Sequence, residues 1–169
     1  MTSPREYLED WLRDAYAMER QAETMLSAQL SRLDNYPLLH AQLRQHLDET
    51  RIQQTLVEGC LRRLGTTPSA IKDLAARIAA YGQVAGGLLA EDEVVKHAMA
   101  CYMFEQVEIA AYTVLIVAAD AAGESEIRAN CERIRQQEFD MASWLARQLP
   151  DITTAFLERS SVERSDAKR

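Results

Sequence analysis

The sequence contains few residues that interrupt helices, because only 6 of its 169 residues are Gly and 4 are Pro. Segments in which β-branched and polar residues alternate are also missing, so we expect no β-sheet. Helix-favouring residues such as Ala, Leu, Glu, Gln and Arg are abundant. The length suits a single domain, and the 47% of hydrophobic residues can supply a sizeable core. The composition therefore predicts an all-α protein.

Three further deficits limit the classes of function. Positive charge is scarce, since 19 Lys and Arg stand against 26 Asp and Glu, and the net charge of −7 argues against binding nucleic acids. We find neither a run of about 18 apolar residues nor the apolar segment of a secretory signal, so we expect a cytoplasmic protein that does not span a membrane. Cys60, Cys101 and Cys131 occupy apolar helical positions, which is typical of core residues in a reducing compartment.

Four long amphipathic segments are predicted to be helices, and they span roughly residues 4–33, 38–64, 91–122 and 124–149. Ser3 and Pro4 suit the cap and the first turn of the first helix. Gly65 suits the end of the second helix. Pro150 is expected to stop the fourth, because proline removes a helical hydrogen bond and clashes with the preceding turn.

The connections between these segments predict the topology. A short turn near residue 35 makes the first two helices an antiparallel hairpin. Residues 66–90, which include a shorter predicted helix at about 69–81, are long enough to return the chain to the other end of the bundle. Two antiparallel hairpins joined by a long crossover form the ferritin-like four-helix bundle. We assign residues 1–159 to this domain, with a short amphipathic piece at 153–157 packed on it, and expect 160–169 to be a disordered tail.

Each of the four predicted helices carries a carboxylate or imidazole in the middle of its apolar stripe. These residues are Glu19, His46, Glu105 and Glu138, and two more glutamates lie one turn away, Glu49 and Glu108. Glu49 is nearer the edge of its stripe. A buried carboxylate without a partner costs on the order of several kcal/mol, and no Lys or Arg lies at the centre of these stripes. Divalent metal ions bound between the helices would offset this cost.

The charge of this set suits two divalent ions, since five carboxylates carry −5 and the two ions carry +4. Oxygen-rich ligands with one imidazole favour iron or manganese over zinc, and we expect two iron ions. Gln53 lies seven residues, or about two helical turns, beyond His46, so it is placed to hydrogen-bond a ligand. Tyr16, Tyr102 and Tyr112 lie nearby, either as ordinary core aromatics or as groups that hydrogen-bond a ligand or carry electrons. Each glutamate alone could be an exposed residue, but the coincidence on four helices favours the metal site.

Several segments of the chain resemble the YciE/YciF family of bacterial ferritin-like stress proteins, most closely its YciE branch. The segments that carry the resemblance are 11–23, 34–37, 46–50, 104–112 and 138–145. They include His-x-x-Glu-Thr and Glu-x-x-Glu-Ile-Ala-x-Tyr, in the order and at the spacing of the family. The resemblance implies a ferritin-like bundle with extra short helices, a homodimer, a di-metal centre and a link to stress responses, but no particular reaction. The chain lacks the Glu-x-x-His pairs of better-known di-iron bundles, which predicts a histidine-poor, asymmetric site.

Two hypotheses follow from these observations. The first is a stress-response protein with a di-iron or di-manganese site in the bundle core that reacts with oxygen or peroxide, with a small oxidant or electron donor as its partner. The alternative is a non-catalytic helical-bundle dimer that binds a partner under stress and has no functional metal. An iron-storage cage or a DNA-protecting protein is disfavoured, because the chain is acidic and has no basic tail.

Overall fold

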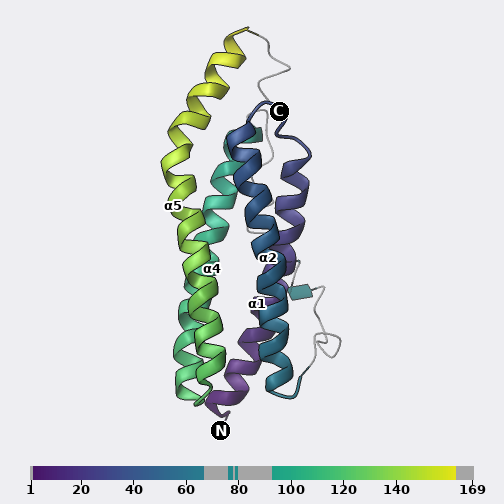
Figure 1. The fold of residues 1–169 in the computed structure, drawn as a ribbon, viewed down its shortest axis with the longest axis vertical. Helices are drawn as coiled ribbons and strands as arrows, with labels where there is room; N and C mark the ends of the chain where they lie inside the picture. Colours follow the sequence, from purple (N-terminus) through teal and green to yellow (C-terminus); the bar gives the residue numbers. More distant parts are fainter. Residues whose placement is uncertain (1, 67–75, 78, 80–92, 163–169) are drawn as a thin grey trace.

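In a computed structural model, four long helices pack side by side into an elongated bundle (Figure 1). The structure describes residues 2–66, 76–77, 79 and 93–162, and no strand occurs among them. The helices are α1 (Pro4–Leu30), α2 (Pro37–Arg63), α4 (Glu93–Ala121) and α5 (Ser125–Val162). α1 and α2 form one antiparallel hairpin and α4 and α5 the other. The predicted all-α bundle of two hairpins is confirmed.

The helix ends follow the local signals in the sequence. The Ser3 hydroxyl accepts a hydrogen bond from the Glu6 backbone N–H at 3.3 Å, and the Ser3 N–H donates to the Glu6 carboxylate at 2.6 Å, which completes a capping box. Gly65 and Gly123 follow α2 and α4 with φ angles of 92° and 73°, a left-handed conformation that favours glycine. These predicted boundaries are therefore correct to within a few residues.

α5 continues through Pro150 to Val162, so the prediction that Pro150 ends the fourth helix is wrong. Proline inside a helix costs about 3 kcal/mol, so later residues must offset this cost. Ile152 is buried, and Phe156 packs against the same apolar cluster as Tyr36. The amphipathic piece predicted at 153–157 is thus part of α5, held in place by packing against the other hairpin.

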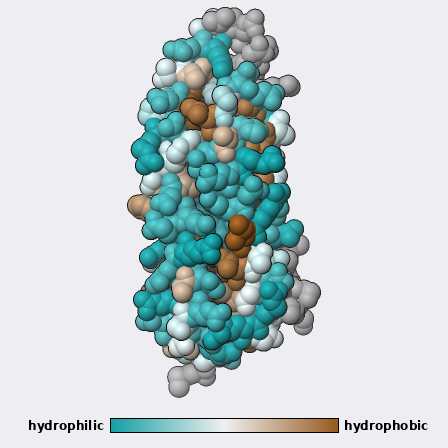
Figure 2. Space-filling view, in the orientation of Figure 1, coloured by the Kyte–Doolittle hydropathy of each residue, from teal (hydrophilic) through white to brown (hydrophobic). Residues whose placement is uncertain are grey.

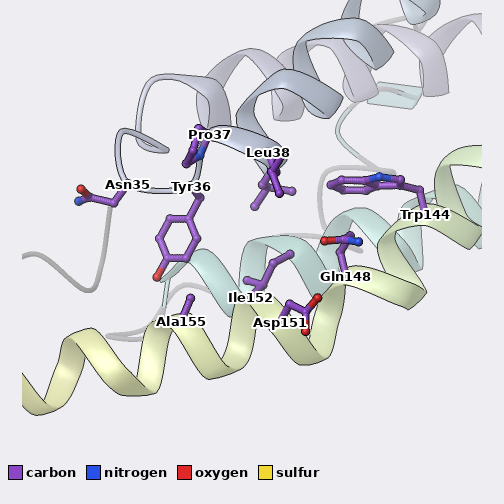
Figure 3. Close-up of a pocket in the computed structure, with 10 residues that line it drawn as sticks. Asn35, Tyr36, Pro37, Leu38, Trp144, Gln148, Asp151, Ile152 and Ala155 are labelled. Atoms are coloured by element: carbon purple, nitrogen blue, oxygen red, sulfur yellow. The ribbon is translucent and has the colours of Figure 1, made fainter.

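The extension of α5 also forms a hollow of about 220 Å³ with the turn between α1 and α2 (Figure 3). Trp144, Asp151 and Ile152 line it from α5, and Tyr36 and Leu38 line it from the turn and the start of α2. On the face shown in Figure 2, hydrophilic side chains predominate and apolar ones form small separate patches. The hollow lies beside the end of the bundle that holds the α1–α2 turn, away from the middle of the helices.

Two other predicted segments fall largely outside the described residues. The crossover at 66–90, with its helix at 69–81, is described only at 66, 76–77 and 79. Within it, Arg77 forms ion pairs with Asp10, at 2.9 Å, and with Asp14, which places residue 77 against α1. The predicted tail at 160–169 begins inside α5, and residues 163–169 are outside the described part of the chain.

The apolar core consists of two clusters, one toward each end of the bundle. One cluster includes Leu12, Leu61 and Ile134, and the other includes Leu43 and Leu145. All three cysteines are buried, as predicted. Several buried residues near the middle of the helices are polar and belong to neither cluster, so polar side chains interrupt the apolar core.

α4 is rotated relative to the predicted stripe. Tyr102 and Ile109 are only half-buried, whereas Cys101, Phe104 and Leu115 are fully buried. Apolar residues occur all around this helix, so their spacing does not define a single inward face. The observed rotation turns both of its central glutamates toward the core.

α4 is also long and apolar enough to cross a membrane by length and composition, with a mean hydropathy of 1.3 over an 18-residue window within Val94–Ala121. This corrects the expectation that no segment is sufficiently apolar. Two glutamates of this helix, Glu105 and Glu108, are buried inside the bundle, and α4 packs against α1 and α5. A core helix of a bundle passes the same test, and this packing fits that interpretation.

Candidate metal centre

A layer of buried polar residues separates the two apolar clusters. Its members come from all four helices, and they are Glu19, His46, Thr50, Gln53, Glu105, Glu108 and Glu138. These residues are between 0% and 3% exposed, although glutamate is rarely buried to this extent. No Lys or Arg is buried anywhere in the described ranges. The structure therefore brings together five of the six predicted ligands, and no buried Lys or Arg of the described residues neutralises their charge.

Four of these residues lie close enough to surround a single ion. His46, Glu105, Glu108 and Glu138 each present one ligand atom, and these four atoms lie within 4.8 Å of one another. Ligand atoms bound to one ion at about 2.1 Å lie within roughly 4 Å of each other, so small side-chain movements would suffice to bind it. Glu19 and Glu49 are outside this group of four.

His46 lies at the centre of the site. Its Nε2 atom is 3.2 Å from Glu105 Oε2 and 3.3 Å from Glu138 Oε2, and its Nδ1 atom is 3.2 Å from Glu49 Oε2. Burial alone would lower the pKa of His46, but the charge of Glu105 and hydrogen bonds to the three carboxylates raise it well above its ordinary value. The raised pKa favours the protonated ring in the metal-free protein, so a metal ion would compete with a proton for His46.

The buried glutamates of this layer have fewer hydrogen-bond donors around them than their oxygens could accept from. Burial raises the pKa of Glu19 to about 8 and raises those of Glu108 and Glu138 well above their ordinary values. Apart from the contacts that two of them make with His46 Nε2, four buried carboxylate oxygens have no hydrogen-bond partner: Glu19 Oε2, Glu105 Oε2, Glu108 Oε1 and Glu138 Oε2. Buried polar atoms in native proteins nearly always have partners. Unpaired oxygens from three helices that surround one imidazole fit the requirements of divalent cations.

Other polar side chains hold the candidate ligands in place. The Gln53 amide donates to Glu138 Oε1 at 2.5 Å, so Gln53 hydrogen-bonds a candidate ligand as expected from the sequence. The Tyr112 hydroxyl donates to Glu19 Oε1. Glu49 is 28% exposed and contacts the Nδ1 side of His46, the position of a carboxylate that orients a ligating imidazole.

Sequence reasoning missed some of these supports. Of the three tyrosines near the site, only Tyr112 is fully buried, and spacing alone did not separate it from Tyr16 and Tyr102. The Gln54 amide, which donates to the Glu19 backbone carbonyl at 3.2 Å, was also missed. The only sequence feature that could have pointed to Gln54 is its position directly after Gln53 on the same helix.

Comparison with known proteins supports this fold. A profile described as "Domain of unknown function (DUF892)" matches residues 3–158. A protein of Xanthomonas campestris pv. campestris, solved by crystallography, is 41% identical, with a TM-score of 0.80 over 94% of this chain and 99% of that one.

Two more distant structures share the same architecture. The stress protein YciF of E. coli is 19% identical, with a TM-score of 0.75 over 89% of this chain and 97% of YciF. A structure of Bacillus anthracis described as ferritin-like, diiron-carboxylate is 15% identical, with a TM-score of 0.71 over 88% of this chain and 99% of that one. At these identities the likeness shows the fold alone, a ferritin-like bundle. Since the family profile matches nearly the whole sequence, this chain belongs to the DUF892 family.

Proposed function

We propose that this protein is a ferritin-like stress-response protein that binds two divalent metal ions, iron in the first place and manganese as the alternative, between its four helices. The observation that carries the proposal is the set of buried carboxylate oxygens without donors around His46. We also place the chain in the YciE branch, because of the sequence segments that resemble it. The fold shared with the E. coli stress protein YciF and with the ferritin-like, diiron-carboxylate structure of B. anthracis supports the proposal by analogy only.

The charge of the buried layer suits this stoichiometry. Its four glutamates, Glu19, Glu105, Glu108 and Glu138, carry −4 when ionised, and two divalent ions carry +4. His46, Glu105, Glu108 and Glu138 would hold one ion, and Glu19, which interacts electrostatically with Glu105 and Glu108, would contribute to the other. Bound iron or manganese would supply electron transfer to oxygen or peroxide. The apolar clusters on both sides exclude bulk water from the site.

Anaerobic loading with ferrous iron tests the proposal. We expect about two iron ions per chain after removal of unbound metal, and consumption of dioxygen when the loaded protein is exposed to air. Glu138→Gln should lose iron because it removes a buried anionic ligand, whereas Glu158→Gln, an exposed glutamate on the same helix, should not. Iron content below one per chain in the wild-type protein would reject the metal-binding function.

A second observation favours a dimer. Only 39% of the most apolar part of α4 is buried within the chain, and residues 109–119 contain no charged residue. Val114 is 48% exposed and Val117 is 66% exposed. Next to them, α1 exposes Tyr7 and Trp11, whose ring centroids are 5.5 Å apart. These residues form one apolar face, here called the α1/α4 face.

We propose that a second copy of this chain covers the α1/α4 face. The face contains a hollow of about 510 Å³, lined by Tyr7 and Trp11 on one side and by Val114 and Val117 on the other. An apolar face can pair with its own copy about a two-fold axis, because the same residues then meet from both chains. Because the α1/α4 face lacks charged residues, a contact through it would bury no charge, although each chain has a net charge of −7.

Mass measurement by light scattering after size exclusion tests this contact. We expect a dimer for the wild-type protein and for Ile52→Glu, which alters an apolar residue that is 50% exposed on α2, and a monomer with unchanged helicity for Val117→Glu. A monomeric wild-type protein would refute the dimer. Sedimentation of that monomer with lipid vesicles would assign the face to a membrane surface instead.

A further inference from the structure

The two parts of the candidate metal centre differ in how ready they are to bind an ion. The group of His46, Glu105, Glu108 and Glu138 already has its ligand atoms within 4.8 Å of one another. Glu19 lies outside this group, and one of its two oxygens, Oε1, accepts the hydrogen bond from Tyr112. Only Glu19 Oε2 is without a partner. Glu19 therefore offers one free atom to a metal ion, whereas the other part of the centre offers four ligands.

We infer that Tyr112 sets the order and affinity of metal binding: the first ion occupies the group around His46, and the second binds more weakly because Tyr112 competes with it for Glu19. This inference rests on the proposed function, since it concerns the same centre. It assigns Tyr112 the role of a positioning residue that acts on the second ion through Glu19.

The surroundings of Tyr112 make this competition effective. Tyr112 is 0% exposed and belongs to the apolar cluster that includes Leu115 and Ile134, so no water can replace Glu19 as the acceptor of its hydroxyl. If Glu19 used both oxygens for a metal ion, the hydroxyl would remain buried without an acceptor. The cost of leaving a buried donor without an acceptor corresponds to roughly a tenfold to hundredfold change in an equilibrium constant.

The contrast with Glu138 strengthens the assignment. Glu138 Oε1 also accepts a hydrogen bond, from the Gln53 amide, but its Oε2 lies 3.3 Å from His46 Nε2 and belongs to the group of four. One oxygen of Glu138 is therefore held by Gln53, and the other is already among the candidate ligand atoms. The free oxygen of Glu19 lies outside that group, so an ion that takes both oxygens of Glu19 must displace the Tyr112 hydroxyl.

Calorimetric titration of metal-free protein with Mn²⁺ tests the inference. For the wild-type protein we expect two binding steps of different affinity. Tyr112→Phe keeps the ring in the core and removes only the hydroxyl, so it should tighten the second step by roughly tenfold to a hundredfold and leave the first step unchanged. Tyr102→Phe, a half-buried tyrosine on the same helix, is the matched control and should change neither step.

Two ligand variants assign the steps independently of Tyr112. Glu19→Gln should abolish the second step and retain the first, whereas Glu138→Gln should weaken the first. An unchanged or weaker second step in Tyr112→Phe would overturn the inference and leave the proposed function intact. Absence of any Mn²⁺ binding to the wild-type protein, with no ferrous iron bound either, would overturn both.

Discussion

Replacement of Glu19 by Gln is expected to stabilise the metal-free protein at neutral pH. Glu19 is fully buried, and burial raises its pKa from 4.5 to about 8, although the hydrogen bond from Tyr112 acts in the opposite direction. At pH 7 the unfolded chain therefore gains free energy by ionising Glu19, while the folded chain keeps the carboxyl protonated. Gln has nearly the same shape, offers Tyr112 the same kind of acceptor and has no proton to lose.

The size of the effect follows from the two pKa values. Because the folded pKa is the higher one, the contribution of Glu19 to stability is complete below about pH 4.5 and is lost as the pH rises toward about 8. A pH of 7 lies about 2.5 units above the unfolded pKa of 4.5, so ionisation of Glu19 stabilises the unfolded chain by about 3 kcal/mol. For a chain of this length, that difference amounts to roughly 6 to 12 °C in Tm.

Thermal unfolding followed by circular dichroism measures this difference. With EDTA present, Glu19→Gln should match the wild-type protein near pH 4.5 and exceed its Tm at pH 7. With excess Mn²⁺ the order should reverse, because the variant has lost a ligand of the second ion and the stability that this ion confers. Glu132→Gln, a partly exposed glutamate on α5, should show neither effect. A metal-free variant that is equal to or less stable than wild type at pH 7 would refute the reasoning.

Three further changes test the supports of the site and of the fold. Gln53→Leu leaves Glu138 Oε1 without its donor and should weaken the first Mn²⁺ step roughly tenfold in calorimetry, with unchanged affinity counting against this support. Glu49→Gln should weaken the same step by about tenfold, because Glu49 contacts only the Nδ1 side of His46. The loss should be smaller than that in Glu138→Gln, and an equal loss would make Glu49 a direct ligand. Ser3→Ala removes the side-chain cap of α1 and should lower stability by about 1 kcal/mol in urea unfolding without altering metal binding.

The sequence predicted those features that depend on local interactions. The capping box at Ser3 and the glycines after α2 and α4 mark helix ends through contacts within a few residues, and the structure places the ends there. The central positions of Glu19, His46 and Glu138 could also be predicted, because apolar residues three or four positions away on both sides fix the inward face of each helix.

The remaining features depend on contacts between distant segments. α5 passes through Pro150 because residues beyond it pack against the α1–α2 hairpin; the amphipathic pattern at 153–157 indicated this packing but not that the helix runs on unbroken. The rotation of α4 could not be read from its spacing, since apolar residues surround it on all sides. The hydrogen bond between Tyr112 and Glu19 joins residues 93 positions apart, so spacing on either helix alone could not identify it.

The central claim is that buried side chains from four helices bind metal ions in the middle of the bundle. Anomalous diffraction at the iron absorption edge, from crystals of protein loaded anaerobically with ferrous iron, tests it most directly. The account predicts two anomalous peaks within the layer of Glu19, His46, Glu105, Glu108 and Glu138. A layer without a peak, with iron bound only to exposed carboxylates or absent, would contradict it.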